Sequence, residues 1–194
     1  MTEPNAAAYD AVRNPRWTER ILLDRLRARH SRVTGAAGNG PEWAYMEHVR
    51  SHSGFDAQST IDALAIHLWR SRQHEIHAFE VKVSKADFRR ELADEQAKSA
   101  IWREWVEFFW IVAPNSVVPK DELPAEWGLL VTWRDGLRVA KQATRLREKP
   151  LGWYPCEPIP RPIVASMLRA AVKTGTRATE SVAEEVGSDA EPAA

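Results

Sequence analysis

The chain has 194 residues, of which 44% are hydrophobic, and this is enough for one domain with a substantial core. Its 27 basic and 27 acidic residues cancel, which at first argues against a nucleic-acid partner, because such proteins usually carry a basic surplus. A single cysteine, Cys156, excludes an intramolecular disulfide framework and a multi-thiolate zinc site. No apolar run is long enough to cross a bilayer, and the polar N-terminus lacks the pattern of a signal peptide, so we expect a cytoplasmic protein.

The neutral average hides two unlike segments. All 27 basic residues lie within 1–179, together with 22 acidic ones, whereas 180–194 contains five acids and no base. Within 134–177, ten bases stand against three acids. The body of the chain is therefore basic, which suits contact with phosphate groups, and the end of the chain is acidic.

The first half of the chain shows two helical patterns followed by two strand patterns. Apolar residues at helical spacing predict an amphipathic helix over 17–30. A proline at a suitable starting position predicts a second helix over 41–50. Two strand-like runs, 61–69 and 75–84, are joined by a polar connector. We therefore expect neighbouring strands that follow two helices.

The second half continues this alternation. A capping-box-like pattern at Ser84 predicts a helix that runs to about Val106. The apolar run 108–113 predicts a buried strand, and 129–141 predicts a hairpin with an Asp-Gly turn. A short basic helix is expected over 163–173. The order of elements describes an α/β fold with a mixed sheet flanked by helices.

Three charged residues interrupt the two apolar strand runs. Glu80 and Lys82 project from the same face of a strand, because side chains alternate, and an antiparallel neighbour can place Asp62 beside them. Carboxylates are the oxygen ligands that Mg²⁺ takes in proteins, and a lysine can orient water or stabilise developing charge. A solvated salt bridge is the alternative. The apolar neighbours favour the metal site, because buried charges are costly unless they are paired or metal-bound.

These residues also resemble a known superfamily. Asp62, followed by Glu80-Val-Lys82 on a second strand and at once by a helix, resembles the PD-(D/E)XK nucleases, although Ile61 replaces the proline. The run from His74 to Leu92 is similar to a phage and bacterial branch close to MmcB-like DNA-repair proteins, and the similarity covers roughly 17–145. The resemblance implies a restriction-endonuclease-like core with a central mixed β-sheet, flanking helices and a C-terminal β-hairpin.

The resemblance also implies a metal-dependent DNA nuclease acting in phage or bacterial DNA repair, recombination or processing. Asp62 and Glu80 would bind Mg²⁺ or Mn²⁺, the backbone carbonyl of Val81 would complete the shell, and Lys82 would be the catalytic lysine. Glu47, on the helix predicted before the strands, matches the position of an extra acidic ligand in many members. A simple exposed helix acid is the alternative for Glu47.

DNA is the expected partner, with a second copy of the chain or another DNA-processing protein as further candidates. The candidate phosphate contacts are Lys85, Arg134, Arg138 and Lys141. A non-catalytic nucleic-acid-binding repair-accessory protein with the same fold is the alternative function.

Four segments are expected along the chain. The nuclease-like domain spans 16–149 and follows a flexible N-terminus at 1–15. A Pro-rich basic extension covers 150–173, and a disordered acidic tail covers 174–194.

Overall fold

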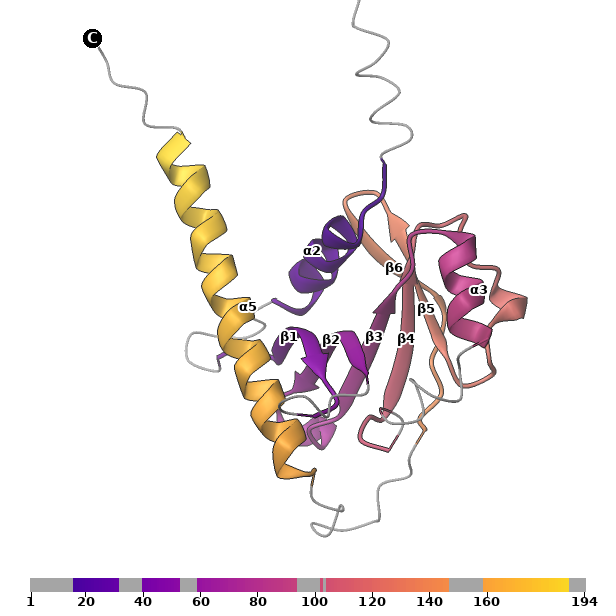
Figure 1. Cartoon of the computed structure of the whole chain (residues 1–194), viewed down its shortest axis with the longest axis horizontal. Coiled ribbons are helices and arrows are strands. Elements are labelled where there is room, and N and C mark those ends of the chain that lie inside the picture. The colour runs from indigo at the N-terminus through magenta and orange to yellow at the C-terminus, as the bar shows by residue number, and fades with distance from the viewer. Residues whose placement is uncertain are drawn as a thin grey trace, which may run out of the picture.

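The computed structural model of the chain describes 16–31, 40–52, 59–93, 102, 104–146 and 159–188, with side chains as far as 178. These residues form a six-stranded mixed sheet with three helices packed against it, which confirms the predicted α/β class (Figure 1). The strands are β1 (Trp43–Arg50), β2 (Thr60–His67), β3 (Ile76–Val81), β4 (Phe108–Ala113), β5 (Gly128–Trp133) and β6 (Gly136–Lys141). The helices are α2 (Glu19–His30), α3 (Lys85–Ala93) and α5 (Arg161–Ser188).

The sheet combines antiparallel and parallel pairing in the order β1-β2-β3-β4-β5-β6. The first three strands form an antiparallel meander, β3, β4 and β5 run parallel, and β6 returns antiparallel to β5. The carboxyl ends of β3, β4 and β5 therefore meet at one edge, where open α/β sheets place their sites. The turn from β5 to β6 lies at the same edge.

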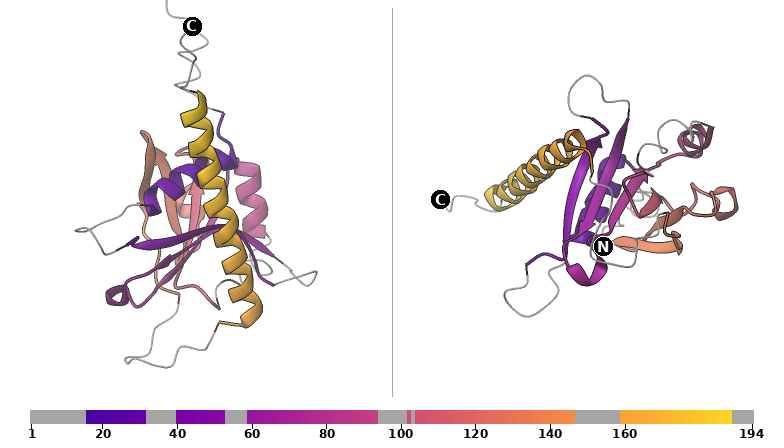
Figure 2. Two further views of the ribbon diagram at one scale, coloured as in Figure 1. Left: turned by 90° about the vertical axis from the view of Figure 1, so that its left-hand side faces the viewer. Right: turned by 90° about the horizontal axis from the view of Figure 1, so that it is seen from below.

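Each face of the sheet carries its own apolar core. On one face, Leu22 and Leu26 of α2 pack with Phe79 of β3. On the other face, Phe88 of α3 and Met167 of α5 belong to a second cluster. Figure 2 shows α5 running along the β1 side of the sheet. The sheet is thus the shared middle layer, and β3 contributes to both cores.

The predicted helix over 41–50 is wrong, because these residues form β1. β1 pairs with β2 from Trp43 to Arg50, and alternate residues face α2, as the hydrogen bond from the Tyr45 hydroxyl to the Leu23 carbonyl (3.3 Å) shows. The helical spacing of Met46 and Val49 is produced by a break in alternation at His48, which has a φ of +52°. Trp43, Tyr45 and Val49 are of the aromatic and β-branched types that are more stable in a paired strand than in a helix.

The predicted disorder from Thr174 onward is wrong as far as Ser188, because α5 is one helix from Arg161 to Ser188. The Thr174 hydroxyl accepts a hydrogen bond from the backbone N–H of Glu47 (3.0 Å), and Ser166 accepts one from the backbone N–H of Arg50 (3.2 Å). α5 therefore runs along the outer edge of β1 and accepts hydrogen bonds from two of its backbone N–H groups, which makes this edge less open to pairing with another chain. The expectations for 1–15, 150–158 and 189–194 lie outside the described residues.

The remaining elements agree with the sequence patterns, with small differences at their ends. The strand over 108–113 is confirmed, and the Ser84 hydroxyl accepts the backbone N–H of Asp87 (3.1 Å) at the start of α3. α3 ends at Ala93, and 94–101 lies outside the described residues. The hairpin is also confirmed, but Gly136 pairs with Trp133, so the turn residues are 134 and 135 rather than Asp-Gly.

Gly128 allows β4 and β5 to pack around a tryptophan. A methyl group at Gly128 would overlap the ring of Trp110, which is itself buried. We expect Gly128→Ala to lower the free energy of unfolding by about 1–3 kcal/mol, the usual cost of overpacking a core. Gly136→Ala is the matched control, because a methyl group there meets no atom within 4 Å. Equal urea midpoints for the two variants would contradict this packing.

Candidate active site at the carboxyl end of β3

The structure brings the three predicted catalytic residues together. The Lys82 ammonium lies 3.6 Å from Glu80 Oε2, and Asp62 Oδ2 accepts a hydrogen bond from the backbone N–H of Val81 (2.7 Å). The carboxyl group of Asp62 is near enough to that of Glu80 to raise the pKa of Glu80. β2 and β3 pair antiparallel, so Asp62 near the start of one strand meets the end of the other. The site lies at the edge where the parallel strands end.

Glu91 belongs to the same group and was not predicted. Its Oε2 accepts a hydrogen bond from the Lys82 ammonium at 2.9 Å, while its Oε1 has no hydrogen-bond partner among the described residues. Glu91 lies three residues after Phe88 on the inward face of α3 and is buried. In the sequence, an acidic residue three positions after Phe88, on the apolar face of the predicted helix, could have indicated that Glu91 is part of the site. We call Asp62, Glu80, Lys82 and Glu91 the carboxylate–lysine cluster.

The cluster holds more negative than positive charge. Burial raises the pKa of Glu80 well above its usual range, and the neighbouring Asp62 raises it further. Burial alone would lower the pKa of Lys82, but Glu80 and Glu91 outweigh it and raise that pKa. Lys82 is therefore a cation at neutral pH. One ammonium beside three carboxylates leaves a site that favours a further cation.

Two residues outside the prediction also lie near Asp62. Glu19, in the first turn of α2, and His48 each place a possible ligand atom within 4.8 Å of one another and of Asp62. Burial and Asp62 raise the pKa of Glu19. The backbone of His48 has a positive φ, a strained conformation that is common at functional sites. Both side chains are exposed, and exposed groups of this kind also occur without an ion, so the trio alone does not establish a metal site.

Glu47 forms ion pairs with three arginines and is not part of the carboxylate–lysine cluster. It lies on β1, and its side chain is 1% exposed. Its carboxylate accepts hydrogen bonds from Arg20 (2.7 and 2.8 Å), Arg27 (2.7 Å) and Arg177 (3.0 Å). Burial alone would raise the pKa of Glu47, but the bonds from Arg20 and Arg27 lower it to about 2. The alternative of an exposed helix acid is wrong, since Glu47 is buried on a strand and contacts three arginines.

The candidate DNA contacts divide between the two ends of the sheet. Lys85 begins α3 directly after the cluster, and Arg134 occupies the β5–β6 turn at the same edge. Arg138 follows on β6, hydrogen-bonds Asn115 (3.2 Å) and lies over the Trp133 ring. Lys141 pairs opposite the start of β5, at the far end, and its ammonium binds two backbone carbonyls. Lys141 therefore has a structural role here.

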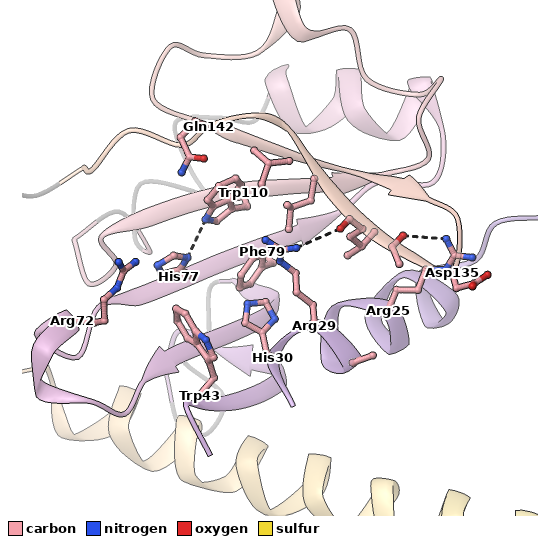
Figure 3. A pocket seen from close by; sticks show the side chains of 15 residues that line it. Arg25, Arg29, His30, Trp43, Arg72, His77, Phe79, Trp110, Asp135 and Gln142 are labelled. Carbon is pink, nitrogen blue, oxygen red and sulfur yellow. Dashed lines mark hydrogen bonds between the residues drawn. The ribbon is translucent and has the colours of Figure 1, made fainter. Parts of the chain in front are cut away.

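A pocket of about 640 Å³ lies on the α2 face, away from the cluster (Figure 3). None of Asp62, Glu80 and Lys82 lines it. Its wall combines the rings of Trp43, Phe79 and Trp110 with two imidazoles and three arginines, against a single acid, Asp135. Arginine side chains from α2 bridge to the backbone of β6 across one end of it. The pocket is therefore aromatic inside and basic at its rim.

The two imidazoles in this pocket are neutral at physiological pH. Burial lowers the pKa of His30 and of His77 to about 4 in each case. His77 Nδ1 accepts a hydrogen bond from the Trp110 indole N–H (3.2 Å), so its proton lies on Nε2, 3.4 Å from Glu75. These contacts make His77 a packing and hydrogen-bonding residue.

The comparisons with known proteins support the fold but identify no family and no function. No family model and no curated protein matches the chain. Among solved structures, the chain is similar to the SPO1766 protein of unknown function from Silicibacter pomeroyi, with a TM-score of 0.50 and 16% sequence identity. The similarity covers 90% of this chain and 94% of that one. Within the described residues, no helix is both long and apolar enough to span a membrane.

Proposed function

We propose that the chain is a metal-dependent DNA nuclease of the PD-(D/E)XK type, with a restriction-endonuclease-like core, that hydrolyses phosphodiester bonds in phage or bacterial DNA repair, recombination or processing. The observation that carries this proposal is the meeting of the half-buried Asp62 with the buried Glu80 and Lys82 at the carboxyl end of β3. A buried carboxylate next to a second carboxylate is stabilised by a proton or by a cation between the two groups.

The residues fit a hard divalent cation. Oxygen donors come from Asp62 and Glu80, with the Val81 carbonyl as a backbone candidate, and Mg²⁺ and Mn²⁺ prefer such ligands. Glu19 and His48 are the side chains near enough to add to this set on the exposed side. Glu47 is left out, because three arginines already hold its oxygens. A bound ion would lower the pKa of a coordinated water and offset charge on the phosphate.

Lys82 contributes a fixed positive charge. Because its neighbours keep it protonated, it cannot remove a proton from water as a general base. Its ammonium can instead orient the attacking water and stabilise the negative charge that builds on the phosphate oxygens. Glu91 holds that ammonium at 2.9 Å and acts as a positioning residue.

The same sheet edge supplies groups that suit the DNA backbone. Lys85 and Arg134 are exposed there, and Arg138 lies near them on β6. Contacts from such side chains would hold the phosphate chain in register without reading its sequence. The proposed DNA path therefore follows the carboxyl edge of the sheet from α3 to the β5–β6 turn.

The variant Glu80→Gln tests whether Glu80 binds metal, because its expected effect on stability differs between metal-free and metal-containing solution. The pKa of Glu80 is raised above 4.5 in the folded chain, so its ionised form costs stability, and that cost grows as the pH rises above 4.5. In EDTA at pH 8, we expect Glu80→Gln to unfold at a higher temperature than the wild type, with a smaller gain at pH 5.

With Mn²⁺ present, we expect the wild type to unfold at a higher temperature than Glu80→Gln. The wild type gains stability from the ion, whereas Glu80→Gln gains little, and calorimetry should show weaker Mn²⁺ binding by the variant. Glu126→Gln, at an exposed position, is the control and should match the wild type in both measurements. Unchanged Mn²⁺ affinity in Glu80→Gln would argue against the proposed ligand.

A non-catalytic nucleic-acid-binding protein is the second candidate, and the pocket on the α2 face favours it. Aromatic rings offer stacking surfaces for bases, and arginines at the rim suit phosphate. This function needs neither metal nor Lys82. DNA binding without cleavage on any substrate, and without a measurable affinity for Mn²⁺, would favour it.

A further inference from the structure

The outward face of α5 carries exposed apolar side chains. None of the described residues packs over this face. Val164, Leu168 and Val172 are 39%, 64% and 70% exposed. They follow one another at intervals of four residues and therefore share one face of the helix. The opposite face packs on the sheet through Met167 and binds β1 through Thr174. We call Val164, Leu168 and Val172 the outer stripe.

α5 also extends beyond the sheet that supports it. Its 28 residues span about 42 Å, whereas the eight residues of β1 span about 26 Å. Figures 1 and 2 both show the C-terminal part of the helix leaving the body of the molecule. In the sequence, Gly175, Thr179, Val182 and Val186 continue the spacing after Val172 at alternating steps of three and four. This spacing is typical of a helix that pairs with another helix.

The charges of α5 are divided between its two halves. Its first part, 161–178, carries four bases and no acid. Its last part, 179–188, carries three glutamates and no base. Two such helices packed in parallel would place like charges together, whereas antiparallel packing places the acids of each helix along the bases of the other. The bases are Arg161, Arg169, Lys173 and Arg177, and the acids are Glu180, Glu184 and Glu185. Arg177 already pairs with Glu47 of its own chain, so Arg161, Arg169 and Lys173 are the bases available to the partner helix.

We propose that α5 pairs antiparallel with α5 of a second copy of this chain. The protruding acidic end of each helix then lies along the outer stripe and the basic residues of the other. Gly175 lies at the middle of α5, where a two-fold axis would bring the helices closest, and its missing side chain leaves open space for that approach. This dimer would neutralise the basic and acidic segments against each other, and it does not depend on nuclease activity.

The first test measures the mass of the full chain by light scattering over a concentration series. The wild type is expected to be a dimer, and Leu168→Glu should weaken the dimer about 30-fold or more, as removal of a central interface residue does. Leu68→Glu is the matched control, because Leu68 is 41% exposed and lies outside α5. A monomeric wild type, or a dimer that survives Leu168→Glu, would overturn the proposal.

The second test determines the orientation. In a Cys156→Ser background, chains carrying Leu168→Cys and chains carrying Val182→Cys are mixed and oxidised. Antiparallel pairing centred on Gly175 predicts a disulfide between the two different chains. Crosslinking of Leu168→Cys with itself would show parallel pairing and contradict the proposal. Added salt should also weaken the antiparallel dimer, because its opposed charges are screened.

Discussion

Lys82→Ala is expected to reduce DNA cleavage by about 10²–10³-fold or more, the usual cost of removing a preorganised charge from an active site. The ammonium is the one cation in the carboxylate–lysine cluster, and Glu80 and Glu91 keep it charged. Mn²⁺ binding should survive the change or become tighter, because a competing positive charge is removed. The pair of measurements is cleavage of labelled DNA and calorimetric Mn²⁺ titration.

Lys85→Ala is the matched control for this prediction. Lys85 lies three residues after Lys82 but is exposed at the start of α3. Its loss should weaken DNA binding by a few-fold and make that binding less dependent on salt, without changing the chemical step. Retention of full cleavage by Lys82→Ala would remove the lysine from the mechanism.

Glu47→Gln is expected to destabilise the fold by about 2–3 kcal/mol, because it removes the charge of a buried carboxylate that accepts hydrogen bonds from three partly exposed arginines. The carboxylate joins α2 and β1 to α5 through Arg20, Arg27 and Arg177. Since the folded pKa of Glu47 is about 2, its contribution is fully present above pH 4.5 and is lost as the pH falls towards 2. The stability difference between wild type and variant should therefore shrink in acid, which urea unfolding at several pH values will show.

Glu47→Gln should leave Mn²⁺ affinity unchanged, in contrast to Glu80→Gln. Glu126→Gln serves again as the exposed control, with a change in stability within about 0.5 kcal/mol. A stable Glu47→Gln variant that had lost Mn²⁺ binding would show instead that Glu47 is a ligand.

The sequence patterns predicted the strands that carry the cluster because those strands are nearly continuous apolar runs. The buried strand over 108–113 and the positions of Asp62 and Glu80 near two strand ends follow from local composition alone. The helix predicted over 17–30 is equally local, because the spacing of its apolar residues indicates α2 without any distant contact. Such features need no knowledge of distant contacts.

The errors concern contacts between distant segments. β1 looks helical in isolation because one strained residue, His48, breaks its alternation. α5 continues past Thr174, whose hydroxyl binds a strand 127 residues earlier in the chain. Glu19 approaches Asp62 only because α2 packs on that face of the sheet. The contacts of Thr174 and Glu19 join segments that are far apart in the sequence, so local patterns do not contain them.

Cleavage of DNA by the purified full chain tests the central claim most directly. Single-stranded, nicked and branched substrates are incubated with the wild type and with Asp62→Asn, in Mg²⁺, in Mn²⁺ and in EDTA. We predict that the wild type cleaves at least one substrate only when the metal is present, and that Asp62→Asn reduces the rate by about 10²-fold or more. No cleavage by the wild type on any substrate, or full activity of Asp62→Asn, would contradict the proposed active site.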